Sequence, residues 1–242
     1  APARGFTLTN NVRLNASADL AGSGGEIIHP SAGPAWDWTD KDGNGATNDP
    51  GDDASNGLDL AGYKLYTDDG TNIILKLGNS FGPGAITGTN VISTARTTTA
   101  SGQGTGNITI LGAGDITCGG IGTQATVSWW QFTDWSGNIT LGINAPGQRL
   151  GNVRVGYLST ALLNGDGGAP GNIYVYSDGN VLIQDAQGTP GDIRTDYNRA
   201  GVRRQVEIQH DGAFVVRDIR THNTGDNYSH PASVFLNGDV KG

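Results

Sequence analysis

The chain of 242 residues has no methionine, one cysteine, four Lys and two Glu. Because Met, Lys and Glu are among the residues that favour helices, helix is not expected to be its main building material. The single Cys118 excludes an internal disulfide and a zinc site made of four cysteines. No stretch approaches the roughly 18 apolar residues of a membrane span, so we expect no membrane-spanning segment.

The residues that are abundant belong to turns: 40 Gly, 21 Asp and 20 Asn. Together with regularly recurring β-branched residues they indicate strands joined by turns. The net charge is −8, and residues 1–120 carry 12 acids against 6 bases, whereas residues 121–242 carry 11 against 9. An acidic surface repels phosphate backbones and suits divalent cations, so a nucleic-acid partner is not expected.

A motif of glycine, then Asn or Asp, then alternating β-branched residues recurs and indicates an internal repeat. Copies of it are Gly106-Asn107-Ile108-Thr109-Ile110, Gly137-Asn138-Ile139-Thr140-Leu141 and Gly171-Asn172-Ile173-Tyr174-Val175. As first strands of successive units they begin at Ile73, Ile108, Ile139, Ile173, Val206 and Val234, in steps of 35, 31, 34, 33 and 28 residues. Turn glycines at 84, 114, 151, 179, 212 and 238 form a second series with the same count.

A unit of about 30 residues with two or three short strands cannot bury its own apolar face, whereas stacked copies can. The sequence therefore predicts an all-β fold in which residues 58–242 form a parallel β-helix, or β-solenoid, of about six coils. Residues 1–57 are less regular and are interpreted as an N-terminal capping region with strands near Phe6 and Val12 and an acidic insertion. An antiparallel sandwich is the alternative, but it gives no reason for the long period.

The alternation within each repeat predicts which side chains fill the interior of the coil. These are Ile108, Ile110, Ile139, Leu141, Ile173, Val175, Val181, Ile183, Ile208, Phe214 and Val216. The Asn or Asp after each glycine has two interpretations. Stacked turns can form a hydrogen-bonded ladder of these side chains, or each is simply a residue that suits a turn.

The segment Leu58-Asp59-Leu60-Ala61-Gly62-Tyr63, followed by coils of Gly-Asn-Ile-x-Val type, resembles the secreted right-handed parallel β-helices of the filamentous-haemagglutinin and autotransporter-passenger type, within the pectate-lyase-like superfold. The resemblance covers residues 58–242. It implies a right-handed coil and a role at a microbial surface as adhesin, fibre or coat component. The start Ala1-Pro2-Ala3 fits a mature secreted chain or a piece of a longer one, and either suggests an extracellular or cell-surface location.

The acidic insertion contains a candidate calcium loop that begins at Asp40. Oxygen ligands at loop positions 1, 3 and 5, followed by glycine at position 6, bring several oxygens onto one hard cation. Position 12 is Gly51 instead of a bidentate acid, so the loop departs from the EF-hand pattern, and a solvated acidic loop is the alternative. We expect a structural Ca²⁺ on Asp40, Asp42, Asn44, Asn48, Asp49 and Asp52.

Stacked acid pairs are the other arrangement with catalytic potential. In this repeat Asp178 would lie over Asp211, and Asp185 over Asp218, each about 5 Å apart, the carboxylate separation of retaining glycosidases. Asp is expected before a turn glycine in any case, so we assign no catalytic residue. A polysaccharide lyase or glycoside hydrolase on a β-helix scaffold is the second hypothesis.

Four aromatic residues crowd one insertion: Trp129, Trp130, Phe132 and Trp135. They either fold onto the flank of the solenoid as a small core or, if exposed, stack on sugar rings or a neighbouring molecule.

Residues 234–242 have the pattern of the opening of a further coil. An uncovered solenoid end exposes strand edges and apolar side chains, so we expect a cover there. It is either a continuation of the natural chain or a neighbouring copy whose head-to-tail contact propagates into a filament. The leading expectation is a non-enzymatic extracellular structural or adhesive protein, a fibre, surface-layer or adhesin subunit, with copies of itself and surface glycans as partners.

Overall fold

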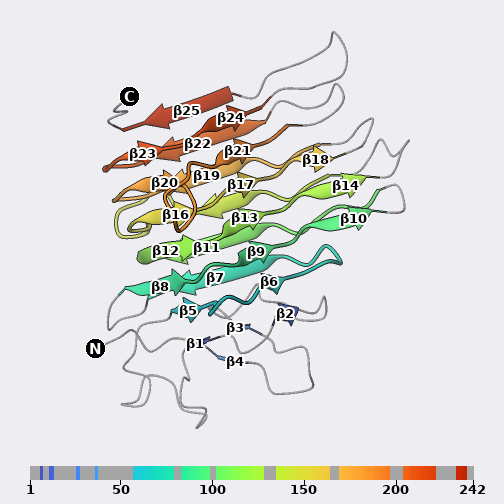
Figure 1. Ribbon diagram of the computed structural model, residues 1–242, viewed down its shortest axis with the longest axis horizontal. Helices are drawn as coiled ribbons and strands as arrows, with labels where there is room; N and C mark the ends of the chain where they lie inside the picture. The colour runs from blue at the N-terminus through green and yellow to red at the C-terminus, as the bar shows by residue number, and fades with distance from the viewer. Residues whose placement is uncertain are drawn as a thin grey trace.

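The computed structural model is an all-β parallel β-solenoid of about five turns (Figure 1). It describes residues 6–7, 11–13, 26–27, 36–37, 57–78, 83–98, 102–127, 135–163, 169–196, 204–221 and 233–238. This part of the chain contains no helix.

Each turn of the coil passes through three stacked sheets, which we call sheets 1, 2 and 3. Sheet 1 contains β7 (Ile73–Leu77), β11 (Ile108–Gly112), β15 (Ile139–Leu141), β19 (Ile173–Tyr176), β22 (Gln205–Gln209) and β25 (Ser233–Asn237). Sheet 2 contains β1 (Phe6–Thr7), β5 (Leu58–Asp59), β8 (Gly84–Thr87), β12 (Gly114–Cys118), β16 (Val153–Val155), β20 (Val181–Ile183) and β23 (Phe214–Val215). Sheet 3 contains β2 (Val12–Arg13), β6 (Leu65–Tyr66), β9 (Val91–Ser93), β13 (Gly120–Gly122), β17 (Leu158–Ser159), β21 (Asp192–Arg194) and β24 (Asp218–Arg220).

Two small sheets complete the described strands. A parallel sheet follows sheet 3 in three of the turns and contains β10 (Arg96–Thr98), β14 (Ala125–Val127) and β18 (Leu162–Leu163). An antiparallel pair is formed by β3 (Glu26–Ile27) and β4 (Trp36–Asp37), at the N-terminal end of the stack in Figure 1. The strands expected near Phe6 and Val12 are β1 and β2, which extend sheets 2 and 3 by one parallel layer.

The register of sheet 1 confirms the repeat that the sequence predicts. The six predicted first residues are direct partners in successive layers: Ile73, Ile108, Ile139, Ile173, Val206 and Val234. In sheet 2, Gly84 pairs with Gly114. All strand pairs of the three sheets are parallel, so the antiparallel sandwich is wrong.

The predicted interior is confirmed. Ten of the eleven residues expected to point inward are buried, and Val216 is partly buried and packs against them. Val216 lies next to the last layer of sheet 2, where no further described layer covers it. Burial of a column of Ile, Leu and Val in every layer supplies the main stabilisation, at about 25 cal/mol per Å² of apolar surface.

The Asn residues that follow the glycines form ladders, so the first of the two interpretations holds for them. In each step a side-chain oxygen accepts the backbone N–H of the corresponding residue one layer further on. On sheet 1 the steps are Asn107 to Asn72 (2.7 Å), Asn138 to Asn107 (2.8 Å), Asn172 to Asn138 (2.8 Å) and Gln205 to Asn172 (2.9 Å). On sheet 2 they are Asn152 to Asp115 (2.6 Å), Asn180 to Asn152 (3.1 Å) and Ala213 to Asn180 (2.7 Å).

A buried polar column occupies the corner after sheet 3. Its members are Thr67, Thr94, Thr123, Thr160 and Thr195, all fully buried. The Thr123 hydroxyl donates to the Gly137 carbonyl (2.5 Å), and the Thr160 hydroxyl donates to the Gly171 carbonyl (2.7 Å). Such bonds satisfy backbone groups that would otherwise be buried without partners, which holds the corner of successive coils together.

Candidate functional site

The predicted calcium loop lies outside the described residues. Asp40, Asp42, Asn44, Asn48, Asp49 and Asp52 all fall in it, so the Ca²⁺ stays a prediction. Within the described ranges, no three His, Cys, Asp or Glu side chains gather as a metal site would require.

The first predicted acid pair forms an ion cluster on the surface. The guanidinium of Arg149 contacts both carboxylates, with its Nε 3.2 Å from Asp178 Oδ1 and its Nη1 3.5 Å from Asp211 Oδ1. The two aspartate side chains are 55% and 61% exposed. The guanidinium between them offsets the repulsion of the two neighbouring carboxylates.

The second predicted acid pair is wrong. Asp218 pairs with Asp192 in sheet 3, and Asp185 lies in a turn, where its Oδ1 accepts the N–H groups of Gln187 and Thr189. Val181 pairs with a residue 33 positions further along the chain, Phe214, whereas Asp192 pairs with a residue only 26 positions further along, Asp218. The difference of seven arises because residues 184–190 form an extra loop of seven residues. The hydrogen bond from the Thr189 N–H, together with that from Gln187, lowers the pKa of the Asp185 carboxyl from its ordinary value.

Asp192 is the most enclosed of these carboxylates. Arg217 Nε donates to Asp192 Oδ1 (2.8 Å), and Arg220 Nη2 lies 3.4 Å from Asp192 Oδ2. The Arg217 hydrogen bond, aided by the nearby guanidinium charges, lowers the pKa of the Asp192 carboxyl. A group whose pKa is lowered by folding stabilises the fold above its unfolded pKa, near 3.9, and loses that contribution as the pH falls through the folded pKa.

We therefore expect the Arg217→Gln variant to lose less stability than the native chain when the pH is lowered below about 4. Urea unfolding midpoints measured from pH 7 down to pH 2 check this. The control is Arg154→Gln, because Arg154 donates to the backbone carbonyls of Asp185 and Ala186 and to no carboxylate there. Equal acid dependence of the two variants would contradict the assignment.

Two further reactive or aromatic side chains are placed by the structure. Cys118 is buried, and burial raises the pKa of its thiol to about 12, so it is no nucleophile at neutral pH. Trp135 packs its indole against Gly104 of the preceding coil and stays 47% exposed. Trp129, Trp130 and Phe132 lie outside the described residues.

The surface that stands out is the last strand, β25, at the C-terminal end of the stack (Figure 1). All five of its residues are exposed, although its partner β22 buries Val206 and Ile208 completely. Val234 and Leu236 continue the two buried columns of sheet 1 but are 41% and 39% exposed. Among the described strands, none pairs with the outer edge of β25.

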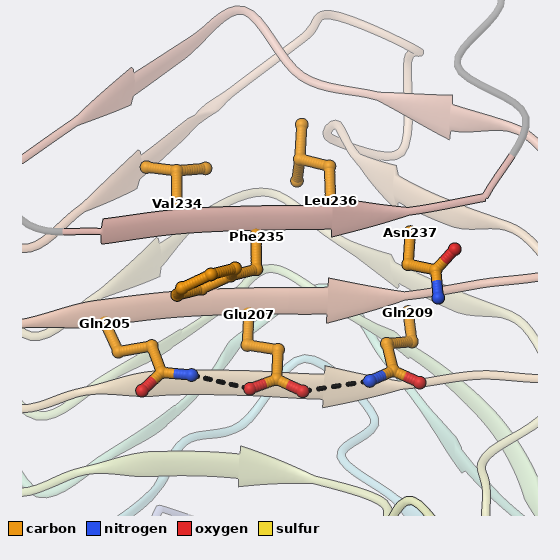
Figure 2. A pocket seen from close by; sticks show the side chains of 7 residues that line it. All are labelled: Gln205, Glu207, Gln209, Val234, Phe235, Leu236 and Asn237. Carbon is orange, nitrogen blue, oxygen red and sulfur yellow. Dashed lines mark hydrogen bonds between the residues drawn. The ribbon is translucent and has the colours of Figure 1, made fainter.

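Beside this edge, residues of β22 and β25 line a groove of about 460 Å³. Its residues are Gln205, Glu207, Gln209, Val234, Phe235, Leu236 and Asn237. Figure 2 shows that Phe235 and Asn237 point to the same side of the sheet as the three β22 side chains. The side chains of Val234 and Leu236 point to the opposite side.

Glu207 is the hydrogen-bonded centre of the groove. Its Oε2 accepts Gln205 Nε2 (2.6 Å), and its Oε1 accepts Gln209 Nε2 (2.9 Å) and the Tyr176 hydroxyl (3.1 Å). Burial, together with the hydrogen bond to Glu207, raises the pKa of Tyr176 to about 12, so the phenol remains a donor. Sequence reasoning missed this group, and the only available signal was the rarity of Glu in the chain.

Comparison of the chain with protein-family models, with the curated proteins and with the solved structures gave no match in any of the three. The likeness to secreted right-handed β-helices therefore rests on the repeat. Among the described residues, no helix is long and apolar enough to cross a membrane.

Proposed function

We propose that this protein is a non-enzymatic, extracellular structural solenoid of the right-handed secreted type, and that copies of it associate through the C-terminal end of the stack. The observation that supports the proposal is β25, an exposed strand whose outer edge no described strand pairs. Exposed strand edges are templates for adding another strand, and natural proteins usually protect them.

The apolar side chains of this end favour a further solenoid layer over water. Val234 and Leu236 are the last members of two columns of side chains, and every lower layer of these columns holds Ile, Leu or Val. A stacked layer would bury both side chains, at about 1.5–3 kcal/mol for each full burial. A second copy supplies such a layer by a head-to-tail contact, which repeats into a filament.

Charge supports the head-to-tail direction. Residues 1–120 carry 12 acids against 6 bases, whereas residues 121–242 are nearly balanced, with 11 against 9. Two acidic N-terminal halves repel each other more strongly than an acidic half and a nearly balanced half, which disfavours a head-to-head contact.

The test is the double variant Val234→Lys with Leu236→Lys. We expect the native chain to form larger species as its concentration rises, with filaments in electron micrographs, and the double variant to sediment as a monomer. Because both side chains are exposed, the variant should keep the circular dichroism spectrum and melting temperature of the native chain.

The matched control is Ile143→Lys, which changes an apolar residue of 39% exposure that follows β15, in a middle layer of sheet 1 and away from both ends of the stack. This control should associate like the native chain. A native chain that remains monomeric at high concentration, or a control that dissociates as fully as the β25 variant, would contradict the proposal.

A further inference from the structure

We propose that the groove around Glu207 binds a neutral polysaccharide through its hydroxyl groups and one apolar sugar face. The inference deepens the proposed function, since it gives the surface solenoid a ligand class for adhesion. It uses the outer face of sheet 1, whereas association uses the end of the stack.

The polar part of the groove is held in place before any ligand arrives. Glu207 accepts three hydrogen bonds, from Gln205, Gln209 and Tyr176, and these fix both glutamine side chains along β22. A carboxamide has two N–H donors and an acceptor oxygen, and each bond to Glu207 uses one donor. The remaining groups, with the Asn237 carboxamide one layer above Gln209, offer an array of donors and acceptors for sugar hydroxyls.

The apolar part of the groove is Phe235. It is the register partner of Glu207 in the next layer, and 55% of its surface is exposed. A pyranose ring has one face of C–H groups that packs on an aromatic ring, while its hydroxyls point sideways to polar neighbours. Tyr174 lies on the other side of Glu207 in the same column, so the polar centre is flanked by aromatic residues of two layers.

The charges of the groove select the class of ligand. None of its seven residues is Lys or Arg, and its only charge is a carboxylate, so phosphate and uronate groups are disfavoured. The Glu207 oxygens already accept three bonds from their own chain, which leaves little capacity for a lysine ammonium. A neutral chain that carries hydroxyl groups matches the donors and acceptors that remain.

The experiment measures binding of neutral hexasaccharides built from glucose, mannose or galactose, by calorimetric titration into the 242-residue protein. We expect at least one of them to bind, and Phe235→Ala to raise its Kd about tenfold through loss of the aromatic contact. Gln209→Ala should weaken binding severalfold. Tyr63→Ala, which removes an exposed aromatic residue far from the groove, should leave the Kd unchanged.

The salt dependence of binding distinguishes a neutral sugar from a cationic ligand. Binding of a neutral sugar should be the same at 50 and 500 mM NaCl, whereas a cationic peptide should bind more weakly in high salt. The inference is overturned if no neutral hexasaccharide binds, if oligolysine binds in its place, or if Tyr63→Ala weakens binding as much as Phe235→Ala.

A variant on β22 keeps this test separate from the test of association. Gln209→Ala changes the groove but leaves β25 intact, so this variant should bind the sugar more weakly and still associate. Phe235→Ala should still associate. Failure of association with intact sugar binding would reject only the assembly, and the reverse result would reject only the sugar site.

Discussion

Replacing Gly137 with alanine should lower the free energy of unfolding by about 3 kcal/mol or more. A Cβ at this position would lie 2.1 Å from the Gly106 carbonyl oxygen and 2.7 Å from the Asn107 nitrogen, both backbone atoms of the preceding coil. Neither backbone can withdraw without breaking the ladder between the two layers. For a chain of this size the loss corresponds to a fall of about 6–12 °C in melting temperature.

The matched control for this prediction is Gly147→Ala. Nothing lies within 4 Å of a Cβ at Gly147, but its φ of +70° is one that alanine adopts with strain. We expect a cost of about 1 kcal/mol from backbone strain alone. If Gly137→Ala melted no lower than Gly147→Ala, the close approach of successive coils at this corner would be refuted.

The second large effect is expected for Thr105→Val, which removes one hydroxyl from the buried corner. The Thr105 hydroxyl donates to the Thr123 carbonyl (2.6 Å) and accepts the Gly137 N–H (2.8 Å). Valine has nearly the same shape but leaves both backbone groups without this partner. We expect a loss of about 2–4 kcal/mol, because each unsatisfied buried group costs about 1–3 kcal/mol.

Serine is the control at this position because the next coil already uses it. Ser136, the register equivalent of Thr105, accepts the Gly171 N–H (3.0 Å) and donates to the Thr160 carbonyl. Thr105→Ser should therefore keep most of the stability and the slow hydrogen exchange of the Gly137 amide. Equal exchange rates in the Val and Ser variants would show that the hydroxyl has no such role.

The repeat of the sequence was sufficient to predict the layers of the coil. Residues one period apart, such as Ile108 and Ile139, become direct partners because parallel layers place equivalent residues one above another. The same reasoning gave a ladder as one of two interpretations of Asn107 and Asn138, and the hydrogen bond between them shows that the ladder is correct. Burial and register are thus nearly local properties of a stacked repeat.

The structural features that the sequence did not predict arise where the repeat is interrupted or where residues of two layers combine. The loop at 184–190 shifts Asp218 from Asp185 to Asp192, and no local signal distinguishes such a loop from a slightly longer strand. The groove around Glu207 needs the outward residues of two layers, and no motif in the sequence links those residues. The column of buried Thr residues at the corner was not predicted either, because its members are separated by unequal numbers of residues.

The parallel stacking also determines how the molecule would respond to mechanical load. Hydrogen bonds between layers run along the axis of the stack, so tension applied between its two ends acts directly on one layer at a time. Detaching a coil of 33 residues, as between Ile173 and Val206, would release about 11 nm of extended chain. Under a pulling flow a tether of such coils would lengthen in discrete steps and absorb work at each one, while the remaining layers stay folded.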